Sequence, residues 1–135
     1  INYICKDIEN SKLDQKFDII LMLEVLEHLD NWERTIRRIK KNLKNNGTII
    51  ISTINRNLLS KIIAINVAEN VLNWIPKGTH DYNKLIKPEE LKSVLSKEKF
   101  HFNDLKGLVF DPFNREWKLS KNYMINYFCT AKFIN

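Results

Sequence analysis

The chain has 135 residues, of which 44% are hydrophobic and 28% are charged, and its formal net charge is +6. This length allows at most one domain with a real core, and the composition is typical of a globular protein, which excludes a disordered chain. No stretch offers the roughly 20 apolar residues that a membrane-spanning helix needs, and a secretory signal is not expected.

The first strongly predicted element is a buried strand. Residues 17–23 form a nearly continuous apolar run, the pattern of a strand that is covered on both faces. Residues 2–5 resemble the end of a short strand, and residues 6–16 form a polar loop between the two. Cys5 and Cys129 have neither metal-ligand nor redox spacing, so both are expected to be reduced in a cytoplasmic setting.

A well-specified helix follows this strand. Asp30 is expected to cap its N-terminus, Glu33 stands where a capping-box carboxylate belongs, and Asn46-Gly47 is the expected end. Spacings of four, three and four residues place one apolar stripe on it: Trp32, Ile36, Ile39 and Leu43. Its basic residues are expected to form a solvated face, with an anionic lipid surface as the alternative. Nucleic acid is not favoured, because no recognised nucleic-acid-binding module accompanies the charge.

A second buried strand completes a βαβ unit. Residues 48–54 are rich in β-branched residues, and a strand, a helix and a strand joined by short loops predict two parallel strands. The polar triplet 55–57 then closes the unit at the sheet edge where the first strand also ends. In open α/β sheets, ligands bind in the crevice at this edge.

Residues 58–81 are expected to be a lid or a membrane-contacting insertion, with plain core as the alternative for their helix. Residues 58–75 look helical but are apolar most of the way round, and only Lys61 and Glu69 are charged. This helix is too polar to span a bilayer. Residues 76–81 form a turn-rich loop after it.

The rest of the chain predicts a short helix and a pair of strands. Pro88 opens the helix at its first turn, and the helix is expected to end near Lys97. Residues 105–110 and 123–133 are the predicted strands. Their connection is too short for a crossover helix, so they should pair antiparallel.

Two carboxylates and an imidazole follow the first strand. Glu24, Glu27 and His28 stand at positions i, i+3 and i+4, which point the same way on a helical turn. Such a set suits a divalent cation such as Mg²⁺, Mn²⁺ or Zn²⁺, which could lower the pKa of a bound phenol or diol. Local capping and pairing, with Glu24 meeting an arginine, is the alternative, and spacing alone does not decide between them.

The sequence resembles one enzyme family in particular. Residues 17–29, with Phe-Asp-Ile-Ile and then Leu-Glu-Val-Leu-Glu-His-Leu, are similar to the fourth strand and following turn of class I S-adenosylmethionine-dependent methyltransferases. A narrower resemblance is to the O-methyltransferases of ubiquinone biosynthesis, which methylate polyprenylated hydroxyphenols and catechols. It is carried by residues 52–57 (Ser-Thr-Ile-Asn-Arg-Asn), 76–81 (Pro-Lys-Gly-Thr-His-Asp) and 86–91 (Ile-Lys-Pro-Glu-Glu-Leu). Further matches extend it over essentially the whole chain.

The resemblance implies roles for individual residues. Leu23 would contact S-adenosylmethionine, and Glu24, Glu27 and His28 match a turn that the family uses for a divalent cation, with Mg²⁺ first among the candidates. His80 is a candidate catalytic residue near the substrate, with a loop-stabilising hydrogen bond as the alternative. In the insertion by which the family engages lipid, the expected contacts are Lys61, Trp74 and Lys77.

The resemblance also implies a fold and a function. The expected fold is α/β, a partial Rossmann-like class I methyltransferase sheet with a C-terminal antiparallel hairpin. Residues 1–135 would form a single incomplete domain, because the glycine-rich first turn and the ribose-binding acid of such enzymes have no counterpart here.

The implied activity is O-methylation of polyprenylated phenols in ubiquinone biosynthesis, by a cytoplasmic protein peripheral to the inner face of an anionic membrane. This chain alone is expected to be inactive or incomplete, with a separate N-terminal half as a candidate partner. Two alternatives stay open. They are a non-catalytic remnant of a split gene, and a membrane-surface module without enzymatic activity.

Overall fold

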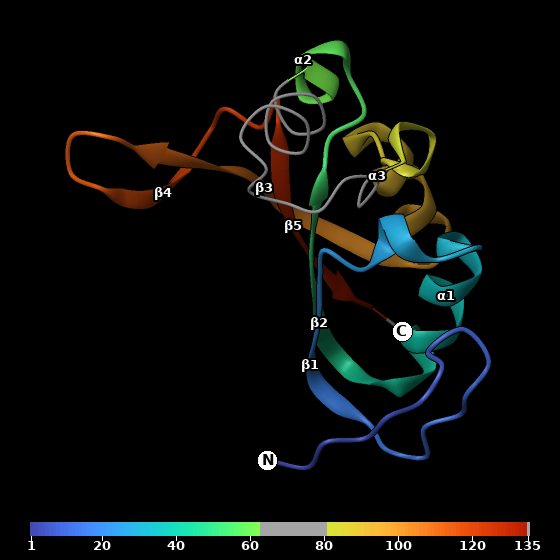
Figure 1. Ribbon diagram of the computed structural model, residues 1–135. Helices are drawn as coiled ribbons and strands as arrows, with labels where there is room; N and C mark the ends of the chain where they lie inside the picture. Colours follow the sequence, from blue (N-terminus) through green and yellow to red (C-terminus); the bar gives the residue numbers. More distant parts are fainter. Residues whose placement is uncertain (63–80, 135) are drawn as a thin grey trace.

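The computed structural model describes residues 1–62 and 81–134 (Figure 1). Within these ranges five strands form one mixed sheet in the order β1-β2-β5-β3-β4. They are β1 (Phe17–Leu23), β2 (Leu43–Ile54), β3 (Phe100–Asp111), β4 (Glu116–Ser120) and β5 (Asn126–Phe133). β1 and β2 run parallel, and the other neighbouring pairs are antiparallel. The predicted α/β class and the parallel strand pair are confirmed.

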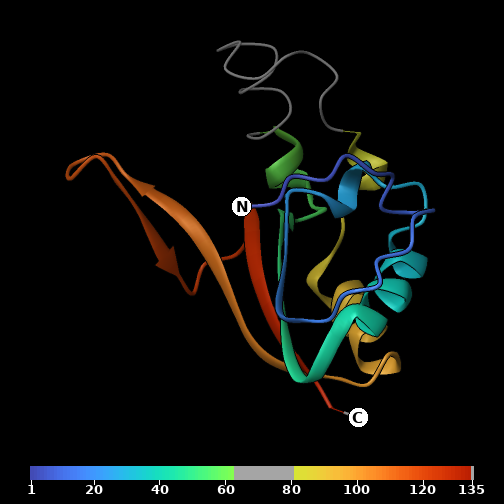
Figure 2. The same ribbon diagram turned by 90° about the horizontal axis from the view of Figure 1, so that it is seen from below.

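The two longer helices of the described residues lie on the same side of the sheet (Figures 1 and 2). The helices are α1 (Trp32–Ile39), α2 (Leu58–Ser60) and α3 (Pro88–Lys97), with single 3₁₀ turns at η1 (Leu26–His28), η2 (Lys40–Asn42) and η4 (Tyr82–Lys84). Between the sheet and these helices lies the core, which includes Met22, Ile36, Ile49, Leu91, Leu95 and Tyr127. The predicted helix from Pro88 to Lys97 is confirmed at both ends.

The two faces of β1 differ sharply. Met22 is buried in the core, whereas Ile19, Leu21 and Leu23 on the other face are 57%, 59% and 48% exposed. The expectation that both faces of this strand are covered is therefore wrong for the described residues. The period of two along a strand sends alternate side chains to opposite faces, and the longer helices cover only one of them.

α1 begins one residue later than predicted and has a different cap. The side chain of Asn31 accepts the backbone N–H of Arg34 at 2.9 Å, so the capping role expected of Asp30 is wrong. Asp30 and Asn31 instead donate their own backbone N–H groups to the carboxylate of Glu9, at 3.1 and 2.9 Å. No capping box with Glu33 accompanies this arrangement.

The same helix ends earlier than predicted. It stops at Ile39, one 3₁₀ turn follows, and β2 begins at Leu43. Asn46 has a φ of 61°, the left-handed conformation expected of a helix end, but it lies in the irregular first part of β2. Leu43 is buried as the stripe predicted, although it belongs to the strand.

The N-terminal segment forms no strand, so the expectation for residues 2–5 is wrong. Cys5 is exposed and Cys129 is buried, and both are free thiols. Burial raises the pKa of the Cys129 thiol to about 12, which keeps it protonated and unreactive. Cys129 is therefore a buried thiol of the core.

The C-terminal strands pair as expected but contain one more element than predicted. β3 and β5 are antiparallel, with Phe100 opposite Phe133. β4 was not anticipated, and it pairs with the distal half of β3 to form a two-stranded extension of the sheet. Of the predicted insertion at 58–81, residues 63–80 lie outside the described residues. The described helices include none long and apolar enough to cross a membrane.

Candidate functional site

The carboxyl ends of β1 and β2 meet where the sequence placed the ligand crevice. The backbone N–H of Glu24, directly after β1, donates to the carbonyl oxygen of Ser52 at 3.0 Å and lies 3.1 Å from the Ser52 hydroxyl. That hydroxyl in turn donates to Oε1 of Glu24 at 2.8 Å. Ser52 is buried, so the two strand ends are joined by a compact polar ring around one side chain.

Glu24 adopts an uncommon backbone conformation at this junction. Its φ is 52°, in the left-handed region that residues other than glycine rarely enter. Such a conformation persists only when surrounding contacts impose it, and it is concentrated at functional sites. Here the contacts with Ser52 hold it. The carboxylate of Glu24 is thereby fixed at the exposed edge of the sheet.

Glu27, whose carboxyl group neighbours that of Glu24, is buried in the protein. It is only 3% exposed, and among the described residues neither carboxylate oxygen has a hydrogen-bond partner. The Thr53 hydroxyl is buried and unpartnered as well. Burial raises the pKa of the Glu27 carboxyl from 4.5 to about 7, and the neighbouring Glu24 carboxylate acts in the same direction. The Glu27 carboxyl group therefore ionises less readily than an ordinary glutamate.

The three predicted metal ligands do not form a cation site in the described part of the chain. The described residues contain no group of three or more histidine, cysteine, aspartate or glutamate side chains that could hold a metal ion. Glu24 lies before the turn in a left-handed conformation, and η1 is a 3₁₀ turn, so the i, i+3, i+4 geometry of an α-helix does not apply. Glu27 is consequently buried while His28 is exposed. The residues present do not fit the expected divalent cation.

The remaining predicted site residues are placed only in part. Leu23 ends β1 opposite Ser52, and its exposed side chain lies at the carboxyl edge. Lys61 is exposed, and its ammonium lies 5.0 Å from the centre of the Tyr82 ring. The predicted roles of Trp74, Lys77 and His80 fall outside the described residues.

The polar triplet after β2 ties this edge to neighbouring segments. Nδ2 of Asn55 donates to the carbonyl of Tyr123 at 3.1 Å, and Asn57 caps α2 with its side chain. Arg56 forms an ion pair with Glu90 of α3. Arg56 and Glu90 also line a pocket of about 200 Å³ beside Leu29 and Asp30. The triplet thus has structural partners at the edge predicted for it.

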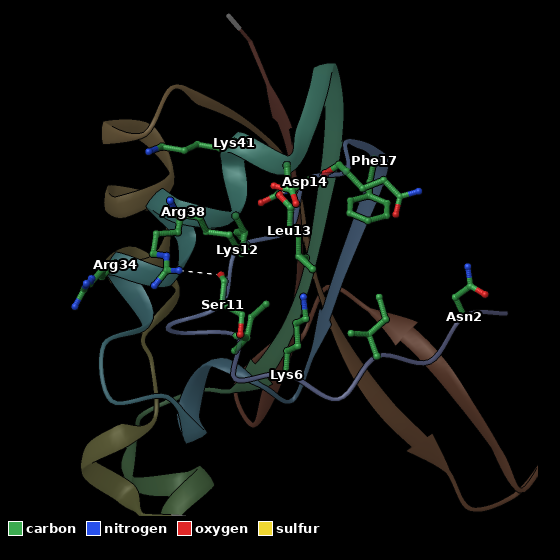
Figure 3. Close-up of a pocket in the computed structure, with 15 residues that line it drawn as sticks. Asn2, Lys6, Ser11, Lys12, Leu13, Asp14, Phe17, Arg34, Arg38 and Lys41 are labelled. Atoms are coloured by element: carbon green, nitrogen blue, oxygen red, sulfur yellow. Dashed lines mark hydrogen bonds between the residues drawn. The ribbon is translucent and has the colours of Figure 1, made fainter.

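A larger pocket, of about 700 Å³, lies away from this edge (Figure 3). Residues of the segment 2–17, of α1 and of η2 line it, and Arg38 donates to the carbonyl of Ser11 across it at 2.8 Å. Its basic lining residues are Lys6, Lys12, Arg34, Arg38 and Lys41. None of its lining residues belongs to the carboxyl edge of β1 and β2, so it is separate from the predicted site.

Sequence analysis missed three polar residues that shape the site: Ser52, Thr53 and Tyr127. Ser52 and Thr53 interrupt an otherwise apolar strand just before its end, which is a readable signal. Tyr127 comes from β5, is fully buried, and donates its hydroxyl to the carbonyl of Ile86 at 3.0 Å. Tyr127 reaches the site because β5 pairs with β2, which places it opposite Thr53. No local sequence pattern predicts this pairing.

The arrangement offers two kinds of contact to a ligand. Leu23 presents apolar surface, and Glu24 presents a fixed carboxylate, which can accept a hydroxyl hydrogen bond or face a positive charge. Behind them, Glu27 adds a second carboxyl group, whose pKa is raised by burial. The edge therefore suits a ligand with an aliphatic part and a cationic or hydroxyl-bearing part.

Comparison with known proteins identifies the family to which this chain is related. A family model described as a methyltransferase domain matches residues 4–105. A relative from Rickettsia conorii, named ubiquinone biosynthesis O-methyltransferase, is 46% identical over 128 residues, which cover 95% of this chain and 44% of the relative. The chain thus spans about half the length of the curated relative that it matches.

Solved structures share the fold at low sequence identity. An S-adenosylmethionine-dependent methyltransferase from Clostridium acetobutylicum has a TM-score of 0.65 at 14% identity, over 98% of this chain and 64% of that one. The plantazolicin methyltransferase BpumL, solved with S-adenosylhomocysteine, also has a TM-score of 0.65, at 17% identity, over 99% of this chain and 59% of that one. With the family model matching most of its length, the chain belongs to the methyltransferase domain family.

Proposed function

We propose that this chain is part of an S-adenosylmethionine-dependent O-methyltransferase that acts on polyprenylated hydroxyphenols or catechols in ubiquinone biosynthesis. The observation that carries the proposal is 46% identity over 95% of this chain to a relative of that name. Because the chain spans 44% of that relative, the activity belongs to a longer assembly. We infer that the remainder comes either from a separate N-terminal half, as the resemblance implied, or from a longer polypeptide that contains this chain.

The carboxyl edge of β1 and β2 has suitable chemistry for this cosubstrate. S-adenosylmethionine, when bound, supplies an electrophilic methyl group on a positively charged sulfur. Leu23 offers an apolar contact, and the Glu24 carboxylate, held by Ser52, offers a negative charge at the same edge. In the proposed reaction the phenolic oxygen attacks the methyl carbon in line while the carbon–sulfur bond breaks, and the phenolic proton passes to a base.

Two further parts of the proposal rest on sequence alone. His80 is the proposed catalytic residue near the phenol. Lys61, Trp74 and Lys77 are the proposed contacts with an anionic membrane surface, which would place the protein at the inner face of the membrane where a polyprenylated substrate resides. The divalent cation forms no part of the proposal, because Glu24, Glu27 and His28 do not fit it.

The test is methyl transfer by the full-length protein that contains this chain, from radiolabelled S-adenosylmethionine to a prenylated catechol. We expect a labelled phenol ether as product. We also expect Leu23→Glu to weaken binding of S-adenosylmethionine at least about tenfold in titration calorimetry, because it replaces an apolar contact by a solvated charge. Leu23→Met is the matched control and should retain binding, since its volume and polarity are similar.

The two measurements separate the alternatives. Binding without transfer to any phenol would favour a non-catalytic protein. No binding of S-adenosylmethionine by the full-length protein would overturn the proposal. Equal affinity of the Leu23→Glu and Leu23→Met variants for S-adenosylmethionine would show that Leu23 does not contact the cofactor. The proposed activity would then be judged by the transfer assay alone.

A further inference from the structure

The distal half of β3 and all of β4 form a two-stranded ribbon, residues 107–120, that projects away from the rest of the sheet (Figures 1 and 2). Its strands pair with each other from Gly107 opposite Ser120 to Asp111 opposite Glu116. β3 pairs with β5 only as far as Lys106, so beyond that point the ribbon has no other strand beside it. A two-stranded hairpin alone is only marginally stable in water.

One face of the ribbon is entirely apolar. Leu108 lies opposite Leu119, and Phe110 lies opposite Trp117, so all four side chains point to the same face. The rings of Phe110 and Trp117 are in contact, with centroids 5.3 Å apart. Trp117 and Leu119 are nevertheless 63% and 66% exposed. Its cross-strand pairs hold the face together, and among its four side chains only Leu108, at the base, is partly covered, while Phe110 is also exposed.

The other face of the ribbon is polar and internally paired. The ammonium of Lys118 lies 2.8 Å from Asp111 and 2.9 Å from Glu116. Val109, opposite Lys118, is the single apolar side chain of this face within the paired positions. The ribbon is therefore amphipathic across its thickness, with an ion-paired side and an apolar aromatic side.

The tip and base of the ribbon add an aromatic ring and unpaired positive charge. Phe113, in the turn, is 95% exposed. Arg115 beside it and Lys121 at the other end of β4 are also exposed, and neither forms an ion pair with a described residue. The cations thus flank the apolar face at both of its ends. The whole chain shares this sign, with a net charge of +6.

We propose that the apolar face and tip of this ribbon insert into the interfacial layer of an anionic lipid bilayer. Tryptophan and phenylalanine beside arginine and lysine suit that layer, where rings enter the acyl boundary and cations meet phosphate groups. The flanking cations provide the charge complementarity that favours an anionic bilayer over a neutral protein surface. The inference deepens the proposed function, since it rests on a substrate dissolved in the membrane, but it uses residues outside the 58–81 insertion.

The test is co-sedimentation of the full-length protein with vesicles of phosphatidylcholine and phosphatidylglycerol, against vesicles of phosphatidylcholine alone. We expect preferential binding to the anionic vesicles. Phe113→Ser combined with Trp117→Ser should reduce that binding by about tenfold or more, because the two aromatic side chains proposed to enter the bilayer are lost. Val109→Ser is the matched control, because it removes an apolar side chain from the polar face of the same ribbon and should bind as the parent does.

Two variants guard against misfolding of the ribbon. Phe113→Ser alone changes a fully exposed side chain, and it should still weaken binding measurably. Arg115→Glu with Lys121→Glu should abolish the preference for anionic vesicles. Parent-like binding of the double serine variant, or equal binding to both vesicle types, would overturn the proposal. The proposal would also be overturned if the parent protein formed a dimer in solution, the double serine variant were monomeric, and neither protein bound vesicles. Since vesicle binding requires no methyl transfer, its failure is distinguishable from failure of the proposed activity.

Discussion

Glu24 and Glu27 have opposite environments although three positions separate them in the sequence. The Glu24 carboxylate is exposed and held by the Ser52 hydroxyl, whereas the Glu27 carboxyl is buried without a hydrogen-bond partner among the described residues. The sequence predicted that both lie at the carboxyl edge of the first strand. It could not predict that one is exposed and the other buried, because the backbone there follows the left-handed φ of Glu24, which a glutamate in a sequence does not indicate.

The buried carboxyl of Glu27 should make stability depend on pH. Its pKa is about 7 in the folded protein against 4.5 ordinarily, so between these values the native state binds more protons than the unfolded state. Stability should therefore fall as the pH rises from 4.5 to 7, by at most about 3 kcal/mol. Glu27→Gln cannot ionise and should lose this dependence, as measured by urea unfolding across that range.

The control for this prediction is Glu33→Gln, which replaces an exposed glutamate on α1. That variant should keep the pH dependence of the parent protein. If parent and Glu27→Gln curves run parallel from pH 4.5 to 7, Glu27 does not ionise in that interval and its burial does not have the effect described.

At the scale of elements, the predictions were correct where the local pattern of side chains determines the bounds of a helix or strand. The bounds of β1 and of α3 follow from an apolar run and from a proline at a first helical turn. They failed where a distant residue intervenes. Glu9 accepts the N–H groups before α1, and local sequence could not reveal that partner. β4 was missed because its pairing partner is the far half of β3, which extends beyond the core.

The base of the ribbon depends on one glycine. A Cβ atom on Gly107 would lie 1.8 Å from the carbonyl oxygen of Asn122, which is backbone and cannot turn aside. Gly107→Ala should therefore displace the segment after β4 and lower the free energy of unfolding by about 1–3 kcal/mol. Limited proteolysis should also cut the ribbon turn faster. Lys106→Ala, next to it, removes only a surface ion pair with Asp104 and should change stability little. Parent-like proteolysis of Gly107→Ala would show that the ribbon base tolerates a side chain.

At the scale of the whole molecule, the described sheet has a covered side and an uncovered one. The order β1-β2-β5-β3-β4 and the placement of α1 and α3 on one side follow from chain connectivity, which a βαβ pattern predicts in part. The exposure of the other side did not follow from the sequence, because an apolar run alone does not say what packs on it. β1 ends the described sheet, so its unpaired edge and its exposed apolar face lie together.

This asymmetry predicts opposite effects for two adjacent substitutions in the purified 135-residue chain. Leu21 is 59% exposed and Met22 is 4% exposed. Leu21→Lys should leave the melting temperature nearly unchanged and reduce self-association in size-exclusion chromatography, because a charge on an apolar edge strand opposes edge-to-edge contact. Met22→Lys should abolish the cooperative melt, because it places an unpaired charge in the core. If Leu21→Lys unfolds the chain as thoroughly as Met22→Lys does, then β1 is covered on both faces in solution, and the one-sided packing of this sheet must be abandoned.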